Sequence, residues 1–208
     1  VTIATEGRMG PVHIDVPISV ANTQVPAEVP AQRRPASVCA PYGPDLETAC
    51  EWLSQAVKPV MIVGVDALNQ GAQQSVSNFA EKHGVPVITT YTAKGIIPED
   101  HDLSLGGAGL SPLADRDLVP FVSSSDLIIC VGYDPIEMRP GWRNIWDPRE
   151  QNVIDITAAP NHHYMHQATL NFIANCAATL DALSDGVTPQ ETWQDGEIRT
   201  LKSALLSS

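Results

Sequence analysis

Residues 59–64, PVMIVG, are a continuous apolar run that ends in a glycine. A run of this kind is typical of a strand buried on both faces, as in a parallel sheet covered by helices. Similar runs recur at VPVITT (85–90), DLIICVG (126–132), NVIDIT (152–157) and residues 170–173. Segments of helical composition separate them, which predicts parallel strands joined by right-handed crossovers. The expected fold class is therefore α/β, a Rossmann-like, doubly wound, mainly parallel sheet with helices on both faces.

The segments between the strands predict the helices that cover the sheet. Asp45 is a candidate N-cap, and the residues after it place apolar side chains at helical spacing. The pair His83-Gly84 closes a second helical segment as a C-cap. We expect helices at residues 45–56, 70–82, 118–125 and 176–183, a weak amphipathic stretch at 198–206, and a glycine-rich loop, GGAGLSP, at 106–112.

Length and charge bound the classes of function. The chain has 208 residues with 12 basic and 24 acidic side chains, and 43% of its residues are hydrophobic. This length is enough for one domain with its own core, so no disulfide or metal is needed to stabilise it. The net charge of −12 argues against nucleic acid and anionic membranes as partners. No apolar run approaches the roughly 20 residues of a membrane span.

The four cysteines are widely separated and form no C-x-x-C pair, which excludes the common zinc and thioredoxin-type motifs. Cys130 lies within an apolar run, where a free thiol packs as a small hydrophobic group. A framework of two disulfides would be unusual in so long a chain, so we expect a reducing, cytoplasmic setting.

The two ends of the chain differ from its middle. The chain begins at Val1 without an initiator Met, and VHIDVP (12–17) has the pattern of a strand that finishes a domain. Recurrent prolines without helical or strand periodicity then predict an extended linker. We therefore expect a strand of a preceding domain within residues 1–20, a Pro-rich linker at 21–44, the main domain at 45–185, and a linker or tail at 186–208.

Ligands of doubly wound sheets bind beyond the carboxyl ends of the strands, and several strand ends here carry glycine or polar residues. One interpretation is a nucleotide site, because glycine permits close approach and aspartate accepts hydrogen bonds from ribose hydroxyls. The other is that glycine ends each strand and aspartate begins a turn. Neither G-x-G-x-x-G nor G-x-x-x-x-G-K-[ST] is present. The candidate cofactor-binding residues are Gly64, Asp66, Thr90, Gly106, Gly107, Gly132 and Asp134.

The histidines point to no metal site. His162 and His166 have the i, i+4 spacing of a helical metal pair. Pro160 precedes them and no carboxylate follows closely, so we interpret these two and His163 as solvated. His101 lies among acidic residues, and we interpret it as part of a turn rather than an acid–base group.

The remaining motifs predict no catalytic residue. Trp142 and Trp146 are one helical turn apart, which favours the edge of the core or a domain contact over an aromatic shelf for a ligand. The chain has no G-x-S-x-G elbow, and no cysteine has an obvious neighbouring base. Nucleophilic catalysis therefore finds no support in the residues.

Three stretches of the chain occur in a recognisable order. They are GPVHIDVPISV (10–20), KPVMIVG with FAEKHGVPVITTYTAKGIIPEDHDLSLGGAG (79–109), and SDLIICVGYDPIEMRPGWRNIW (125–146) followed by NVIDI. Together they resemble the central domain of thiamine-diphosphate-dependent enzymes of the acetolactate synthase group. The first resembles the last strand of that family's pyrimidine-binding domain. The resemblance covers roughly residues 1–185 and is specific to the superfamily more than to one reaction.

The resemblance implies that this chain is a domain fragment of a larger enzyme. In the family, the preceding pyrimidine-binding domain carries a catalytic glutamate, and the following diphosphate-binding domain holds Mg²⁺ through a G-D-G…N motif. This chain has neither, so we expect no cofactor in the fragment and no activity alone. Thiamine diphosphate and Mg²⁺ are expected in the full-length parent, whose flanking domains would be partners in a homo-oligomer. The parent would decarboxylate a 2-oxo acid such as pyruvate and transfer the two-carbon unit to an acceptor carbonyl.

Some relatives bind FAD or another adenine nucleotide in the central domain. FAD-binding members carry an Ala-Arg-Phe-Asp-like segment and a Met-His-Gly run. This chain has Tyr133-Asp134-Pro135-Ile136-Glu137-Met138 and Gly107-Ala108-Gly109-Leu110 instead. Both departures argue against FAD, and the pattern is closer to the flavin-independent, catabolic acetolactate synthases. A stand-alone adenine-nucleotide or FAD-binding module is the alternative hypothesis, and a packing domain without a ligand is the third.

Overall fold

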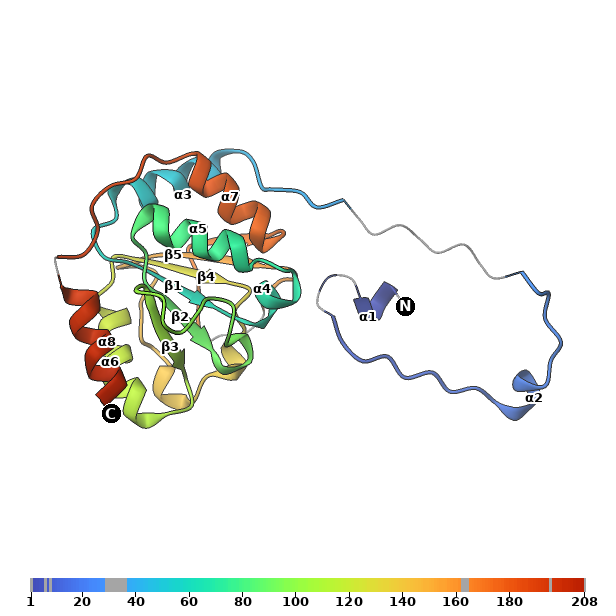
Figure 1. Cartoon of the computed structure of the whole chain (residues 1–208). Helices are drawn as coiled ribbons and strands as arrows, with labels where there is room; N and C mark the ends of the chain where they lie inside the picture. Colours follow the sequence, from blue (N-terminus) through green and yellow to red (C-terminus); the bar gives the residue numbers. More distant parts are fainter. Residues whose placement is uncertain are drawn as a thin grey trace. The chain divides into compact units, whose positions relative to one another are not determined.

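The computed structural model describes residues 2–5, 7, 9–28, 37–161, 165–194 and 196–207. The chain divides into two compact units, Val1–Ser37 and Val38–Ser208 (Figure 1).

The first unit is short and contains two single-turn helices, α1 (Thr2–Thr5) and α2 (Ile18–Ala21). Residues 9–28 are exposed, and in the described part of the chain residues 12–17 pair with no strand. A strand requires a hydrogen-bonded neighbour. The expected strand of a preceding domain therefore stays a prediction. Residues 29–36 of the expected linker lie outside the described residues.

A six-stranded, all-parallel sheet forms the centre of the second unit. The strand order β3-β2-β1-β4-β5-β6 reverses direction between β1 and β4, as in doubly wound folds, and this confirms the predicted fold class. All five residues of β1 and of β4 are buried, because helices cover both faces of the sheet. The strands are β1 (Pro59–Val63), β2 (Val87–Thr90), β3 (Ser104–Ala108), β4 (Leu127–Val131), β5 (Asn152–Thr157) and β6 (Leu170–Ile173).

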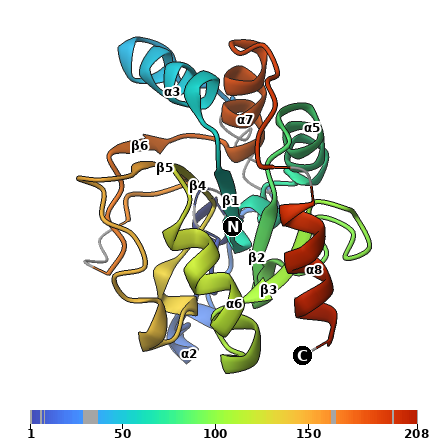
Figure 2. The ribbon, with the colours of Figure 1, turned by 90° about the vertical axis from the view of Figure 1, so that its left-hand side faces the viewer.

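Helices lie in two layers, one on each face of the sheet (Figures 1 and 2). On one face α3 (Pro44–Gln55), α5 (Gln73–His83) and α7 (Cys176–Asp185) enclose an apolar core that contains Leu53, Phe79 and Leu180. On the other face α6 (Pro112–Ser123) and α8 (Glu197–Ser207) cover a second core. The remaining elements are α4 (Val65–Asn69) and the 3₁₀ turns η1 (Tyr91–Ala93), η2 (Pro135–Glu137) and η3 (Pro140–Trp142). Among the described residues, no helix is long and apolar enough to cross a membrane.

Three of the expected elements differ in the structure. The glycine-rich segment expected as a loop contains the end of β3, which pairs with β2 after a shift of register. The helix expected at 118–125 begins at Pro112, because Ser111 accepts a hydrogen bond from the Ala114 amide and proline is favoured in the first turn. The single helix expected at 70–82 is preceded by the separate short helix α4.

Residues 186–207 belong to the same compact unit as the sheet. The weak amphipathic stretch at 198–206 falls within α8, and the side chains of Ile198, Leu201 and Leu205 pack on the second core. The segment expected as a linker or tail is therefore docked on the domain.

Candidate functional site at the carboxyl edge of the sheet

The strand order brings the predicted site residues to one edge of the sheet. Gly64 follows β1, Thr90 ends β2, and Gly132 follows β4. Gly106 and Gly107 lie within β3. Because β3, β2, β1 and β4 are successive neighbours, all of these positions share the carboxyl edge. In open α/β sheets this edge is where ligands bind, at the point where the strand order reverses.

At that point of reversal the chain's own backbone fills the space. A Cβ added to Gly64 would lie 2.6 Å from the Cα of Tyr133, and one added to Gly132 would lie 2.9 Å from the carbonyl carbon of Asp66. Gly132 also has a φ of +60°, which favours glycine. The Asp66 amide donates to the Gly132 carbonyl at 3.1 Å. Both glycines thus allow α4 to pack on the end of β4, as the turn interpretation expects.

The polar candidates are engaged by neighbouring groups of the protein. Asp134 caps η2, its Oδ1 accepting from the Ile136 amide at 3.1 Å. The Thr90 hydroxyl lies 3.2 Å from the hydroxyl of Thr92, which in turn donates to a Glu137 carboxylate oxygen. The loops that follow β2 and β4 are therefore tied to each other across the edge. The loop after β4 is also tied to β3, because the Arg139 amide donates to the Gly109 carbonyl at 3.0 Å.

A buried carboxyl group that the sequence analysis missed lies on β5. Asp155 is only 6% exposed, and its Oδ1 has no hydrogen-bond partner among the described residues. Burial raises the pKa of this carboxyl to about 7, although a hydrogen bond from Asn161 opposes the rise. The signal was a single acidic residue within the apolar run NVIDIT.

Two cysteines near this carboxyl group are buried and free. Cys130 is directly opposite Asp155 in the pairing of β4 with β5, and burial raises its pKa well above the ordinary value. Burial also raises the pKa of Cys176 to about 12, with smaller contributions from the carboxylates of Asp66 and Asp155. A thiol is nucleophilic as its thiolate. These two cysteines therefore stay protonated and inert near neutral pH, as expected for Cys130.

The prediction of a solvated His166 was wrong. His166 is buried, and its Nε2 lies 2.7 Å from the carbonyl oxygen of Trp142, to which it must donate. Nδ1 is then the acceptor for the Tyr133 hydroxyl at 2.7 Å. Burial lowers the pKa of His166, so the neutral ring is the stable form. Tyr133 directly follows Gly132, the glycine after β4, but sequence alone could not pair it with a residue 33 positions away.

The tryptophans and the other histidines mostly match their expected roles. Trp142 and Trp146 are both buried in the second core, and the Trp146 ring lies 4.4 Å from the ring of His166. His101 holds a turn, because its Nδ1 accepts from the Leu103 amide while Nε2 contacts Glu81 at 3.0 Å. His162 and His163 lie outside the described residues.

Comparisons with known proteins decide the family. The model of the family described as "Thiamine pyrophosphate enzyme, central domain" matches residues 46–183. The chain belongs to this family. The matched range is close to the expected main domain at 45–185.

Relatives of this central domain include catalytic proteins that are much longer. The acetolactate synthase large subunit of Corynebacterium glutamicum is 34% identical over 135 residues, which cover 62% of this chain and 21% of the relative. Glyoxylate carboligase of Escherichia coli O157:H7 is 35% identical over 128 residues, or 61% of this chain and 21% of the relative. The chain thus spans about a fifth of the length of these curated relatives.

Solved structures agree with the fold of this central domain. A protein from Mycobacterium smegmatis, assigned as a thiamin diphosphate-dependent enzyme, superposes with a TM-score of 0.72 at 26% identity. The superposition covers 93% of this chain and 37% of the Mycobacterium smegmatis protein. Benzoylformate decarboxylase from Polynucleobacter necessarius superposes with a TM-score of 0.67 at 20% identity, covering 91% of this chain and 35% of its own. This second likeness concerns the fold alone.

Membership of the family implies thiamine diphosphate in the parent enzyme and domains that flank this one. That this fragment itself binds neither the diphosphate nor its metal stays a prediction. Among the described residues, no group of three His, Cys, Asp or Glu side chains is placed to hold a metal ion. The acidic residues Asp134 and Glu137 lie in the loop after β4 at the carboxyl edge, where negative charge opposes that of a diphosphate.

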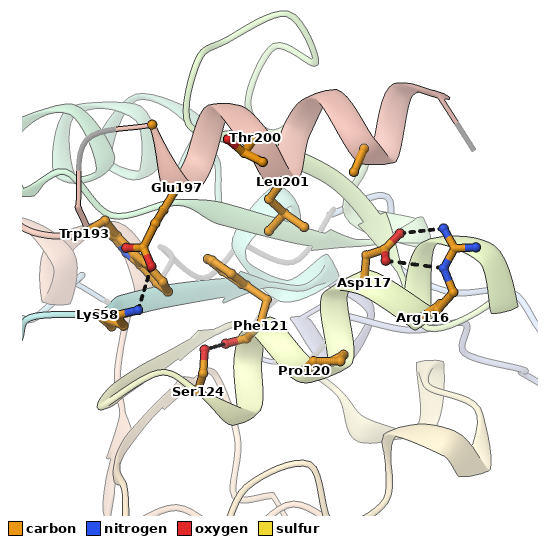
Figure 3. Close-up of a pocket in the computed structure, with 12 residues that line it drawn as sticks. Lys58, Arg116, Asp117, Pro120, Phe121, Ser124, Trp193, Glu197, Thr200 and Leu201 are labelled. Atoms are coloured by element: carbon orange, nitrogen blue, oxygen red, sulfur yellow. Dashed lines mark hydrogen bonds and ion pairs between the residues drawn. The ribbon is translucent and has the colours of Figure 1, made fainter.

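A groove of about 560 Å³ lies between α6 and α8 (Figure 3). The stacked rings of Phe121 and Trp193, with centroids 4.4 Å apart, are part of its lining, and an ion pair joins Lys58 to Glu197 at 2.7 Å. The groove contains none of the predicted site residues. It therefore lies apart from the edge where doubly wound sheets bind their ligands.

Proposed function

We propose that this chain serves as the non-catalytic central domain of a larger thiamine-diphosphate-dependent enzyme. The observation that carries the proposal is the family match over residues 46–183 in a chain that spans about a fifth of its catalytic relatives. The chemistry of the carboxyl edge supports it. The buried thiols there are protonated, and backbone atoms occupy the space beside Gly64 and Gly132.

The parent enzyme would decarboxylate a 2-oxo acid such as pyruvate and transfer the two-carbon unit to an acceptor carbonyl. Similarity to an acetolactate synthase and to a glyoxylate carboligase supports a reaction between two carbonyl compounds. Thiamine diphosphate supplies the carbanion chemistry in such enzymes, and Mg²⁺ would hold its diphosphate in a flanking domain. In this reaction the central domain positions its neighbours and contacts no reacting atom.

Flanking pyrimidine-binding and diphosphate-binding domains are the proposed partners, within a homo-oligomer. The exposed segment at residues 12–17 supports the first of these partners. Val12, Ile14 and Val16 alternate with polar residues, as in a strand with one buried face, yet all three side chains are exposed. Such a face is stable when it packs on a neighbouring sheet. The free cysteines support a reducing, cytoplasmic compartment.

Activity measurements test the proposal directly. The chain mixed with thiamine diphosphate, Mg²⁺ and pyruvate is expected to release no CO₂, whereas a protein that also contains both flanking domains is expected to release it. Turnover by the chain alone would overturn the non-catalytic assignment. A reading frame that encodes residues 1–208 and no further domain would overturn the larger parent.

The candidate residues for a nucleotide site stay Gly64, Asp66, Thr90, Gly106, Gly107, Gly132 and Asp134, and the fragment itself is predicted to bind no cofactor. Equilibrium dialysis with FAD and with ADP tests it. We expect no retention, because backbone packing fills the edge between β1 and β4. Stoichiometric retention of either compound would show that the edge opens to a ligand.

A further inference from the structure

Most exposed apolar side chains of the sheet domain lie at its carboxyl edge. In the described part of residues 44–194, six large apolar side chains are exposed. Val57 precedes β1 and so lies at the amino edge, where the strands begin. The other five lie at or beyond the carboxyl ends of strands: Tyr91, Leu110, Leu113, Ile136 and Ile173. We call these five residues the apolar row.

The apolar row extends across the width of the sheet. Leu110 and Leu113 follow β3, and Tyr91 follows β2. Ile136 follows β4, and Ile173 ends β6. Because β3 and β6 are the two outer strands and neighbouring strands lie about 4.8 Å apart, the row is roughly 24 Å long. A small ligand is enclosed by a pocket, whereas exposed apolar side chains spread over this distance are typical of an interface with another protein.

The loops that carry the apolar row hold one another in place. The loops after β2 and β4 are joined by the hydrogen bond from Thr92 to Glu137. The loops after β3 and β4 are joined through Gly109, whose carbonyl accepts from the Arg139 amide at 3.0 Å. The Gly109 amide in turn donates to Asp115 Oδ1 at 3.0 Å, which ties the same loop to α6. The surface is therefore preformed, and covering it requires little further ordering of the loops.

The helices offer no comparable surface in the described part of residues 44–194, where α3, α5 and α7 contribute none of the six exposed side chains. The last helix, α8, lies away from the row. Glu197 pairs with Lys58, which precedes β1, and Lys202 donates to two carbonyls that precede β3. These contacts attach α8 beside the amino ends of two strands. Figure 1 accordingly shows α8 and α4, which follows β1, at opposite sides of the domain.

The first helix of the sheet domain, α3, runs back over the sheet. Its last turn lies at the amino edge, because the amides of Val57 and Lys58 just beyond it donate to Asp126, which precedes β4. Leu46 and Leu53 both pack on the first core, so α3 lies over the sheet along its length. A helix of 12 residues is about 18 Å long, and its first turn therefore lies well toward the carboxyl edge.

We propose that the apolar row is the docking surface for the domain that precedes this one in the parent enzyme. The inference rests on the proposed function, which places a pyrimidine-binding domain before the central domain. The chain spans about a fifth of its curated relatives, so most of such a parent lies outside it. A preceding domain joins the sheet domain at the first turn of α3, on the side of the row. A following domain would continue from α8, beside the amino ends of the strands.

Maleimide labelling of two cysteine variants tests the docking surface. Ile136→Cys and Val57→Cys place thiols at positions that are 72% and 60% exposed, one in the row and one at the amino edge. Mass spectrometry of the labelled peptides distinguishes them from the native cysteines, and in the 208-residue chain we expect similar rates. In a protein that also contains both flanking domains, Ile136→Cys should react at least about tenfold more slowly and Val57→Cys less than about threefold more slowly, because a covered thiol is inaccessible. An unchanged rate at position 136, or equal slowing at both positions, would overturn the proposal.

Photo-crosslinking of the longer protein identifies what covers the row. With p-benzoylphenylalanine in place of Ile136, we expect a crosslinked peptide from the preceding domain of the same chain. A crosslink to the following domain or to a second copy would overturn the choice of partner. Release of CO₂ from pyruvate, measured in the same preparations, separates this inference from the proposed function. A protein that releases CO₂ while position 136 stays reactive refutes the docking surface alone, and one that protects position 136 without releasing CO₂ refutes the proposed function alone.

Discussion

Replacing Asp155 with Asn should stabilise the domain in a pH-dependent way. The carboxyl group is buried on β5, and one of its oxygens has no hydrogen-bond partner among the described residues. Burial raises its pKa from 3.8 to about 7. The unfolded chain therefore loses this proton at a much lower pH than the folded domain does. Ionisation of Asp155 opposes folding, so its effect on stability grows as the pH rises from about 4 to about 7 and is constant above that range.

The size of the effect follows from the two pKa values. At about 1.4 kcal/mol per pH unit, a rise from 3.8 to about 7 corresponds to about 4 kcal/mol. Asparagine cannot ionise. Asp155→Asn should therefore raise the free energy of unfolding by up to about 4 kcal/mol near pH 8 and by close to zero near pH 4.

Urea denaturation across this pH range, followed by circular dichroism, measures the effect. Asp181→Asn is the matched control, because it makes the same chemical change at an exposed position on α7 and should give little change at any pH. The reasoning from burial would be refuted if Asp155→Asn and the unsubstituted chain were equally stable near pH 8, or if the difference between them did not vary with pH.

Three further substitutions test other contacts. Gly132→Ala should lower the free energy of unfolding by about 2–4 kcal/mol, because a Cβ at this positive φ meets the backbone of α4. Gly141→Ala is the control, because a Cβ there meets open space, and thermal denaturation of both variants should show little loss for it. Tyr133→Phe should cost about 1 kcal/mol in urea, because it removes the donor to Nδ1 of His166; an unchanged midpoint would contradict the assigned hydrogen bond. Asp126→Ala should cost about 1–2 kcal/mol, because its carboxylate accepts from two amides that precede β1; no loss in a urea titration would show these bonds to be dispensable.

Stability should also fall in acid because of His166. Burial lowers the pKa of this ring below its ordinary value of 6.5, so the unfolded chain takes up the proton more readily than the folded domain. The stability associated with the neutral ring is present above that value and is lost as the pH falls.

The strands and most helices were predictable because their signals are local. A continuous apolar run such as residues 59–64 specifies a doubly covered strand without reference to the rest of the chain. β3 was missed because its sequence, SLGGA, has two glycines and an edge strand needs fewer apolar residues. The five-residue helix α4 is too short to show a period.

The chemistry of the candidate edge was less predictable, because it depends on contacts between distant residues. Sequence placed Gly64 and Gly132 at strand ends, but only the structure shows that each is required by the approach of the other's loop. His166 belongs to a polar cluster in the sequence and is buried because Tyr133 and the carbonyl of Trp142 satisfy both ring nitrogens. Asp155 is buried because β5 lies between β4 and β6 in the sheet, a placement that depends on distant residues.

Two measurements on the same samples test most directly whether this central domain is non-catalytic and binds no cofactor of its own. Thiamine diphosphate with Mg²⁺ is titrated into the chain by calorimetry, and decarboxylation of pyruvate is followed. The expected result is no saturable heat of binding and no CO₂, because the described residues offer neither a metal site nor a favourable environment for a diphosphate. Saturable binding at one site per chain, or CO₂ released in proportion to the chain, would contradict the assignment.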